Sequence, residues 1–355
     1  MRVGIVYLSY ACVPLLPEVV SAWKKLTYPK DKLSVYFVDN ASQDGALPLM
    51  RRLLDEDVGH ELPRVKIIAN ETNLGFAAGN NVGIRQAIAD GAEFVYLHND
   101  DLRLDPRAID EVVAKMADPT VGAVQSLVCY WDDEGKVNTS GNMIHFLGFG
   151  FARDNGRRRF EITVKDGEEI AYASGAAVLM RASALEEVGS LEEHYWMYHE
   201  DLELGWRFRL AGWKSVIATS SLAFHRYEFK RSIKKFFWME RNRWLVMLSL
   251  LKIPSLVLLV PWMVLLEVAA MPIRIRGGWA GEIKNVYLYL LRPTTWKHIR
   301  GKRKQIALIR KTSDRDVMRL WTGKVEHQET DSPFVRLLNP LLAGLWRVVY
   351  FWVRW

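Results

Sequence analysis

Three oxygen-bearing side chains stand together after an apolar run in the first third of the chain: Asn99, Asp100 and Asp101. The run itself, residues 94–97 (FVYL), has the composition of a buried strand. A strand there would deliver the three side chains into a turn, where their oxygens suit a hard divalent cation that carries a diphosphate. The alternative is an acidic turn that caps a helix starting near Pro106, because Asp is favoured at helix starts. The neighbouring segments must decide between a cation site and a cap.

Three more polar clusters follow expected strands. Ser9 and Tyr10 end the first strand. Residues 39–45 (DNASQDG) follow the second, and Asp39 could accept a hydrogen bond from a base N–H or a ribose hydroxyl, although such a sequence is also an ordinary strand-to-helix loop. Residues 73–81 (NLGFAAGNN) place two glycines around a helix start, which allows the backbone to approach a diphosphate.

The elements that must position these clusters alternate between strand and helix over the first 230 residues. The strand-like runs are 3–9, 33–39, 65–69 and 94–97, and the helical stretches between them include 14–26, 46–56 and 77–90. This alternation predicts an α/β fold with a Rossmann-like, mostly parallel central sheet covered on both faces. Ligands of such sheets bind at the carboxyl ends of the strands, so the four clusters should meet on one side of the molecule.

Composition sets further bounds. A chain of 355 residues, half of them apolar, suffices for one large domain and an appendage. Cys12 and Cys129 have no metal-binding spacing and could form at most one disulfide, which favours a reducing, cytosolic setting. The first ten residues pass directly into a strand-like run, so we expect no signal peptide.

Six segments now occur in one order: VYLSY, VDNASQDG, NLGFAAGNN, LHNDD, SGAAVLMR and MYHEDLELGWRFRLAGW. Together they resemble the inverting GT-A glycosyltransferases of family 2, and within that family the bacterial rhamnosyltransferase-like branch. The resemblance covers about residues 1–250. It implies a GT-A fold and a nucleotide-diphosphate-sugar donor.

The resemblance also implies roles for individual residues. It places Asp39 near the base, and Asp101 and His225 at a divalent cation, Mg²⁺ or Mn²⁺, although a lone His at a strand end is as often structural. Two positions depart from the family pattern, because Asn99 replaces the first carboxylate of the DXD-type motif and Ala11 stands where Asn is frequent. The full set of predicted donor-binding residues is Ser9, Tyr10, Asp39, Asn40, Asp44, Asn73, Gly75, Phe76, Asn80, Asn99, Asp100 and Arg207.

The pair Glu200–Asp201 is the predicted catalytic group. Inverting transfer is a direct displacement, so a carboxylate must take the proton of the acceptor hydroxyl. The resemblance assigns that role to Asp201, whereas the alternative is that both carboxylates only cap a helix. Arg207, further along the same helical pattern, suits a phosphate through its planar guanidinium, although a solvated helix charge would be a simpler account.

The remainder of the chain has a different character. Residues 226–311 contain 19 basic and 4 acidic residues, a net charge of +15 that leaves −8 elsewhere. Residues 244–272 are long and apolar enough to cross a bilayer, but Lys252, Pro254, Pro261 and Glu267 favour broken helices in the interface. Nine of the fourteen Trp follow residue 237, as expected of a headgroup belt. We therefore expect a GT-A domain at 1–230 and a helical membrane-association region at 231–355.

These observations predict a bacterial enzyme on the cytoplasmic face of the inner membrane, attached in a monotopic or re-entrant manner to anionic lipids. Its expected reaction is sugar transfer to a polyprenyl-linked saccharide for cell-surface polysaccharide synthesis, and the family resemblance alone favours dTDP-rhamnose as the donor. Residues 174–183 should return a strand near the acceptor, and residues 130–159 should form a variable acceptor loop. The alternatives are an inactive nucleotide-sugar-binding protein, a glycoside hydrolase, which adjacent carboxylates make improbable, and a nucleic-acid-binding protein, which we do not expect.

Overall fold

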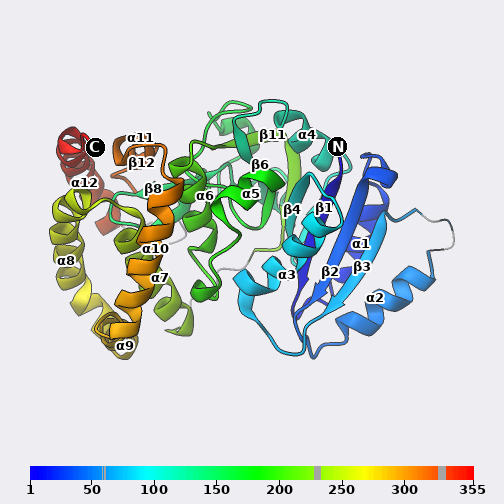
Figure 1. Ribbon diagram of the computed structural model, residues 1–355, viewed down its shortest axis with the longest axis horizontal. Coiled ribbons are helices and arrows are strands. Elements are labelled where there is room, and N and C mark those ends of the chain that lie inside the picture. Colours follow the sequence, from blue (N-terminus) through cyan, green and yellow to red (C-terminus); the bar gives the residue numbers. More distant parts are fainter. Residues whose placement is uncertain (58, 60, 228–232, 327–332) are drawn as a thin grey trace.

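The computed structural model describes residues 1–57, 59, 61–227, 233–326 and 333–355, called the described residues below. An α/β domain and a helical region lie side by side (Figure 1). The larger sheet within the described residues has the spatial order β3 (Arg64–Ala69), β2 (Leu33–Asp39), β1 (Val3–Ser9), β4 (Phe94–Asn99), β10 (Ala177–Arg181), β6 (Val121–Tyr130), β11 (Lys214–His225) and β5 (Leu102–Leu104), with β7 (Val137–Thr139) beside β6.

Most of this sheet is parallel. Strands β3, β2, β1 and β4 run parallel to one another, and β11 runs parallel to β6. The antiparallel exceptions are β10, which lies between β4 and β6, β5 beside β11, and β7 beside β6. The predicted α/β class with a mostly parallel sheet is confirmed, and the strand expected within residues 174–183 is β10.

Side chains alternate between the two faces of the sheet because the side-chain period of a strand is two. On β1, Ile5 and Tyr7 enter one core with residues of α1 (Leu16–Lys24), α2 (Ala46–Asp55) and α4 (Ala108–Lys115). Val6 and Leu8 enter the opposite core with residues of α3 (Gly75–Ala89), α5 (Ala182–Val188) and α6 (Glu200–Leu210). Strand β1 is therefore buried on both sides, and its carboxyl end is the part left to carry function.

Residues 130–159 are not the loop that we expected. They contain β7 and two strands of a second, three-stranded sheet, in which β8 (Asn142–His145) lies between β9 (Gly150–Ala152) and β12 (Trp321–Thr322). Strands of two to four residues are too short to show an alternating pattern, which is why the sequence did not reveal them. Through β12 this sheet joins the α/β domain to the helical region.

The helical region comprises α7 (Ile233–Leu250), α8 (Ile253–Arg276), α9 (Ala280–Leu290), α10 (Pro293–Ile309), α11 (Asp314–Met318) and α12 (Pro333–Trp352). Its apolar core includes Leu202, Trp206 and Leu210 from α6, whereas Leu204 and Phe208 of the same helix enter the core of the sheet. Helix α6 is thus shared by both parts. The expected boundary at residues 230/231 lies outside the described residues.

Residues 244–272 are divided between two helices. The chain leaves helical geometry at Lys252, as predicted, but α8 continues through Pro261 and Pro272. Trp residues of this part are also divided, because Trp244 and Trp321 are buried whereas Trp262, Trp296 and Trp352 are exposed. The concentration of Trp after residue 237 therefore reflects internal packing as well as surface exposure. A headgroup belt explains only part of it.

Candidate active site

The carboxyl ends of β1, β2 and β4 form the edge of the sheet at which the predicted donor residues collect. Ser9 is aligned with Asp39 between β1 and β2, and Leu8 is aligned with Asn99 between β1 and β4. Since parallel strands end at the same edge, the three following loops begin from neighbouring points. The strand ends therefore bring the loops after residues 9, 39 and 99 together.

Asp101 and His225 are in direct contact. Oδ1 of Asp101 lies 2.9 Å from Nε2 of His225, and Nδ1 of His225 lies 3.1 Å from Oδ1 of Asn138. The antiparallel pairing of β5 with β11 produces this contact by setting His225 opposite Leu102. Burial alone would raise the pKa of Asp101, but the hydrogen bond and charge of His225 outweigh it and hold that pKa below the usual value.

The Asp101–His225 pair has the donor atoms of a partial cation site. Among the described residues, no group of three or more His, Cys, Asp or Glu side chains is placed to hold a metal ion. Enzymes that act on nucleotides commonly bind Mg²⁺ through one or two protein ligands together with substrate phosphates and water. A carboxylate facing an imidazole, with the Asp101 side chain 38% exposed, fits that arrangement.

The other two residues of the acidic turn face inward. Oδ2 of Asp100 accepts a hydrogen bond from the Tyr10 amide at 2.8 Å, and the Asp100 carbonyl accepts one from the Tyr7 hydroxyl at 3.1 Å. Burial, followed by the charge of Asp101, raises the pKa of Asp100 to about 7. The amide of Asn99 donates to the Ala176 carbonyl at 3.0 Å. The turn is thus fixed to β1 on one side and to residues before β10 on the other.

The loop after β2 is organised by two carboxylates. Asp39 is buried, and its Oδ1 accepts from the Ser42 amide at 3.3 Å. Asp44 accepts from the Val13 amide at 3.0 Å and from the Ser42 hydroxyl at 2.6 Å. Asp44 therefore holds the loops after β1 and β2 together, while the Tyr10 side chain is 51% exposed beside them. Ser9, by contrast, is buried, and its hydroxyl lies 3.1 Å from the thiol of Cys12.

Asn40 ties this loop to the start of α3. Its Nδ2 donates to Oδ1 of Asn73 at 2.9 Å and to the Gly75 carbonyl at 3.3 Å, and its Oδ1 accepts from the Leu74 amide at 3.0 Å. Asn73 in turn accepts from the Gly75 amide at 2.8 Å. Hydrogen bonds therefore connect the loop after β2 to the segment before α3, and the side chains of Asn40 and Asn73 support the backbone there.

Both the backbone conformation and the limited space at position 75 require a glycine. Its φ is +80°, and a Cβ at this position would lie 2.6 Å from the ring of Trp196. The amides of Phe76 and Ala77 donate to the Trp196 carbonyl at 2.8 and 3.2 Å. Asn80 is buried and donates to the Phe76 carbonyl at 2.9 Å, so its side chain acts within α3.

Asp201 opens α6 beside the residues that precede β10. Its Oδ2 accepts from the Gly175 amide at 3.2 Å, and its Oδ1 accepts from the Leu202 amide at 2.7 Å. Burial raises the pKa of Asp201 above that of an ordinary carboxyl. Since the Ala176 carbonyl binds the Asn99 amide, residues 175 and 176 connect the acidic turn directly to Asp201.

Glu200 differs from Asp201 in its environment. It is buried, and within the described part of the chain its Oε2 has no hydrogen-bond partner. Burial, and then the neighbouring charge of Asp201, raise its pKa well above the usual value, which favours the neutral acid. Asp201, by contrast, accepts two backbone hydrogen bonds, and these favour its ionised form.

Arg207 does not join this cluster. It is buried, and its Nε lies 2.8 Å from Oε2 of Glu203, one helical turn earlier. Its remaining nitrogens donate to the carbonyls of Val188, Gly189 and Ser190. A guanidinium whose donors are all directed to the protein has none to offer a phosphate. The structure therefore gives Arg207 a role in holding α6, in place of the donor-binding role that we expected.

Comparison with known proteins agrees with this geometry. The family model described as "Glycosyl transferase family 2" matches residues 5–189, slightly more than half of the chain. The chain belongs to glycosyltransferase family 2. The enzyme is therefore a glycosyltransferase, and the resemblance found in the sequence is confirmed.

One curated relative and two solved structures are informative. An N-acetylglucosaminyl-diphospho-decaprenol L-rhamnosyltransferase of Mycobacterium tuberculosis is 28% identical over 241 residues, which cover 62% of this chain and 75% of that protein. The mannosyltransferase PcManGT of Pyrobaculum calidifontis, in complex with GDP-Man and Mn²⁺, has a TM-score of 0.52 at 18% identity and covers 86% of each chain. S. aureus TarS 1–349, in complex with UDP, has a TM-score of 0.51 at 14% identity, with 99% of this chain and 90% of that one covered. The two structures confirm the GT-A fold.

Two residues of the site escaped the sequence analysis. Asn138 contacts His225, and Trp196 packs on Gly75. Gly175 lies in the segment SGAAVLMR that the sequence analysis placed near the acceptor, but its hydrogen bond to Asp201 was not foreseen. Asn138 lies in a segment without a recognisable chemical motif. Trp196 stands four residues before Glu200, and that nearness is the signal that could have identified it.

Proposed function

We propose that this glycosyltransferase transfers a sugar, with inversion, from a nucleotide-diphosphate sugar to a polyprenyl-linked saccharide. One observation carries the proposal: the Ala176 carbonyl holds the acidic turn through Asn99, and the adjacent Gly175 amide holds Asp201. A diphosphate at Asp101 and an acceptor at Asp201 would then be neighbours. Such preorganisation converts a two-substrate encounter into a reaction between positioned groups.

The proposed roles combine the family resemblance with this geometry. Residues of the loops after β1 and β2, chiefly Tyr10 and Asp39, bind the nucleoside. Asp201 takes the proton of the acceptor hydroxyl as its oxygen bonds to the anomeric carbon and the bond from that carbon to the diphosphate breaks. Asp101 and His225 would hold Mg²⁺ or Mn²⁺, which when bound neutralises charge on the leaving diphosphate. The raised pKa of Glu200 favours its neutral form, which would leave the negative charge of the pair on Asp201.

The donor and acceptor are proposed from the mycobacterial relative. Its name specifies transfer of L-rhamnose to a decaprenol-linked N-acetylglucosamine, so we propose dTDP-rhamnose as the donor here and a lipid diphosphate as the acceptor. Both would serve cell-surface polysaccharide synthesis. An inactive nucleotide-sugar-binding protein is the second candidate, since Asn99 removes one charge from the acidic turn, but Asp101 and Asp201 retain the groups that catalysis needs.

A panel of nucleotide sugars tests the donor. With Mn²⁺ or Mg²⁺ present, dTDP-rhamnose should raise the melting temperature more than other sugar nucleotides or free rhamnose, because a ligand that binds the native state alone stabilises it by about 2.7 kcal/mol at 100 times its Kd. The shift should shrink after EDTA treatment. Stabilisation by no nucleotide-diphosphate sugar would refute the proposal.

Membrane attachment is proposed from the surface of the helical region. Helix α8 is long and apolar enough to cross a membrane by length and composition. One stripe of it nevertheless packs on the protein, and its Glu267 and Arg274 are buried in ion pairs with α7. A spanning helix would have to abandon these pairs at high cost. We therefore propose that α8 lies along the interface.

The surface available to lipid, named the lipid face here, consists of exposed apolar residues of α8 and α12. Trp355 Nε1 donates to Ser255 Oγ at 2.8 Å and so fixes the end of the chain beside the start of α8. Exposed apolar surface next to basic residues suits an anionic bilayer. The lipid face includes Val257, Val264, Leu265, Val268, Leu337, Leu341, Phe351 and Trp352.

Charge placed on the lipid face should weaken attachment. The double variant Val257→Asp/Val268→Asp puts two carboxylates on one side of α8, because eleven residues are close to three helical turns. We expect it to lose most sedimentation with anionic liposomes, while Phe160→Asp, an exposed position of the α/β domain, sediments like the wild type. Complete release of the wild type by salt alone would show that the lipid face is not inserted.

A further inference from the structure

The backbone just before the Glu200–Asp201 pair is strained. Trp196, Tyr198 and His199 have φ angles of 64°, 66° and 68°, in a region that residues with a side chain rarely adopt. Such a backbone conformation is unfavourable for residues with a side chain and persists only where the surroundings enforce it. We name residues 194–199 the turn segment. The question is what enforces its conformation.

Two adjacent residues of α7 bind the carbonyls of the turn segment. Asn242 Nδ2 lies 3.0, 2.9 and 2.7 Å from the carbonyl oxygens of Tyr195, Met197 and Tyr198. Arg241 Nη2 lies 2.7 Å from the His194 carbonyl and 3.2 Å from that of Tyr195. Four of the six carbonyls in the turn segment therefore face α7. We call the pair Arg241 and Asn242, which binds them, the α7 clamp.

Hydrogen bonds within the α7 clamp fix the orientation of its side chains. Oδ1 of Asn242 accepts hydrogen bonds from Nε and Nη2 of Arg241 at 2.9 and 2.7 Å, which fixes the amide with its nitrogen toward the turn segment. Asn242 is fully buried, so water cannot replace its bonds. Arg241 also lies over the ring of Trp238, 4.3 Å from its centroid, and Trp238 stacks on Trp196.

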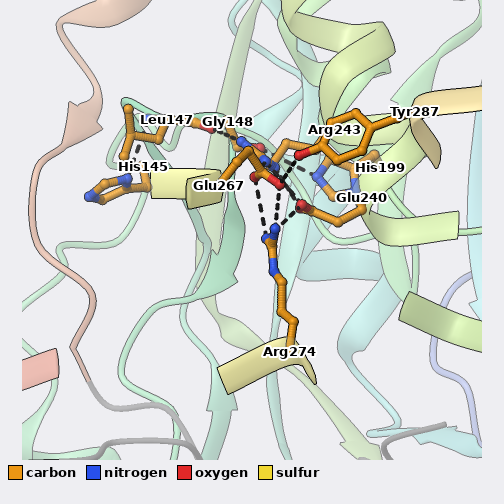
Figure 2. Close-up of polar contacts among 9 residues, drawn as sticks. All are labelled: His145, Leu147, Gly148, His199, Glu240, Arg243, Glu267, Arg274 and Tyr287. Carbon is orange, nitrogen blue, oxygen red and sulfur yellow. Dashed lines mark hydrogen bonds and ion pairs between the residues drawn. The ribbon is translucent and has the colours of Figure 1, made fainter. Parts of the chain in front are cut away.

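The next residue of α7 fixes the helix from its other side. Figure 2 shows Arg243 among the carboxylates of Glu240 and Glu267, with Arg274 of α8 closing the group. Arg243 also donates to the Leu147 carbonyl at 2.8 Å, and the neighbouring Gly148 carbonyl lies 3.4 Å from Nε2 of His199. Helix α7 is therefore anchored to α8 and to the end of the turn segment at once.

The turn segment also reaches the donor side. The Trp196 carbonyl accepts from the first amides of α3, Phe76 and Ala77, and the Trp196 ring fills the space that Gly75 leaves. A shift of the turn segment would therefore move Asp201 relative to the donor loop. A displacement of about 1 Å can cost on the order of 10²-fold in rate. The position of the turn segment therefore affects the rate of the reaction.

We propose that Asn242, supported by Arg241, is a positioning residue that sets Asp201 for proton abstraction, although it lies in the helical region and more than fifty residues beyond the matched family segment. The inference rests on the proposed function, because it presumes that Asp201 is the base. Asn242 acts through the backbone of the turn segment. Its side chain is fully buried.

The test is a double-mutant cycle on the full-length protein, with the lipid acceptor and a saturating donor. Asn242→Ala should lower kcat on the order of 10²-fold and change the donor KM less than about threefold. In the Asp201→Asn background the same substitution should cost less than about threefold more, because a residue that acts through Asp201 has nothing left to position. Asn339→Ala, which removes two hydrogen bonds to the Val325 backbone elsewhere in the helical region, is the matched control and should keep kcat within about twofold.

Other outcomes are decisive too. Losses that multiply in the double variant, or a rise in donor KM with kcat unchanged, would overturn the positioning role. If Asn242→Ala does not unfold cooperatively, Arg241→Gln takes its place in the same cycle, with an expected loss of about tenfold because the Asn242 amide remains. Full activity of Asp201→Asn alone would overturn the proposed base, whereas multiplying losses beside an impaired Asp201→Asn would overturn only the clamp.

Discussion

Asp201→Asn is expected to lower kcat by roughly two to four orders of magnitude, the range for losing a general base. The amide keeps the size of the side chain and can still accept from the Gly175 amide, so the fold and the donor affinity should persist. Steady-state kinetics with the lipid acceptor, together with donor titration, measures both. An Asp201→Asn enzyme with near-normal kcat would show that the proton leaves by another route.

Glu200→Gln is the matched control for this variant. Burial raises the pKa of Glu200 well above its usual value, which favours the neutral acid, and Gln is a neutral side chain of the same size. We expect a loss of less than about tenfold, well short of the loss from removing a base. The reverse pattern, with Glu200→Gln crippled and Asp201→Asn nearly normal, would exchange the roles within the pair.

The pH dependence follows from the same assignment. A base works when it is ionised, and burial raises the pKa of Asp201, so kcat should fall with decreasing pH at a higher pH than for an ordinary Asp. This acid limb should disappear in Asp201→Asn. An unchanged acid limb in that variant would assign the titration to another group.

Asp101→Ala is expected to abolish measurable transfer and to remove most of the cation dependence of donor binding. It deletes the exposed carboxylate that faces His225 and leaves the imidazole without its anionic partner. Isothermal titration with the donor, with and without Mn²⁺, measures the effect. Asp132→Ala removes an exposed carboxylate beside Arg226 and should behave as the wild type. Cation dependence that survives Asp101→Ala would place the ion elsewhere.

Much of the fold could be predicted because the central strands β1, β2 and β4 are buried on both sides. The β1 and β2 bounds agree with the sequence prediction residue for residue, since Val3–Ser9 and Leu33–Asp39 are almost continuous apolar runs. Strand β4 extends two residues beyond the prediction, to Asn99, because pairing with Leu8 continues the ladder past the last apolar residue. Local pattern thus finds a strand, whereas its end depends on a partner.

The site was predicted where a motif coincides with a strand end, and missed where contacts are distant in sequence. Arg207 shows the limit most clearly, because its spacing suggested a phosphate ligand while its burial against Glu203 gives it a structural role. Glu203, four residues earlier, was an available signal of an intrahelical pair. Asn242 offered no signal, since the backbone carbonyls that its amide binds lie more than forty residues away in sequence.

The central claim is inverting transfer from a nucleotide-diphosphate sugar to a lipid-linked acceptor, and the anomeric configuration of the product tests it most directly. Purified full-length enzyme would be incubated with dTDP-rhamnose, Mn²⁺ and a polyprenyl-diphosphate N-acetylglucosamine, and the new glycosidic bond examined by NMR. The account predicts a product of opposite anomeric configuration to the donor, with its formation lost in Asp201→Asn. A product that retains the donor's configuration would contradict the single displacement on which the role of Asp201 depends.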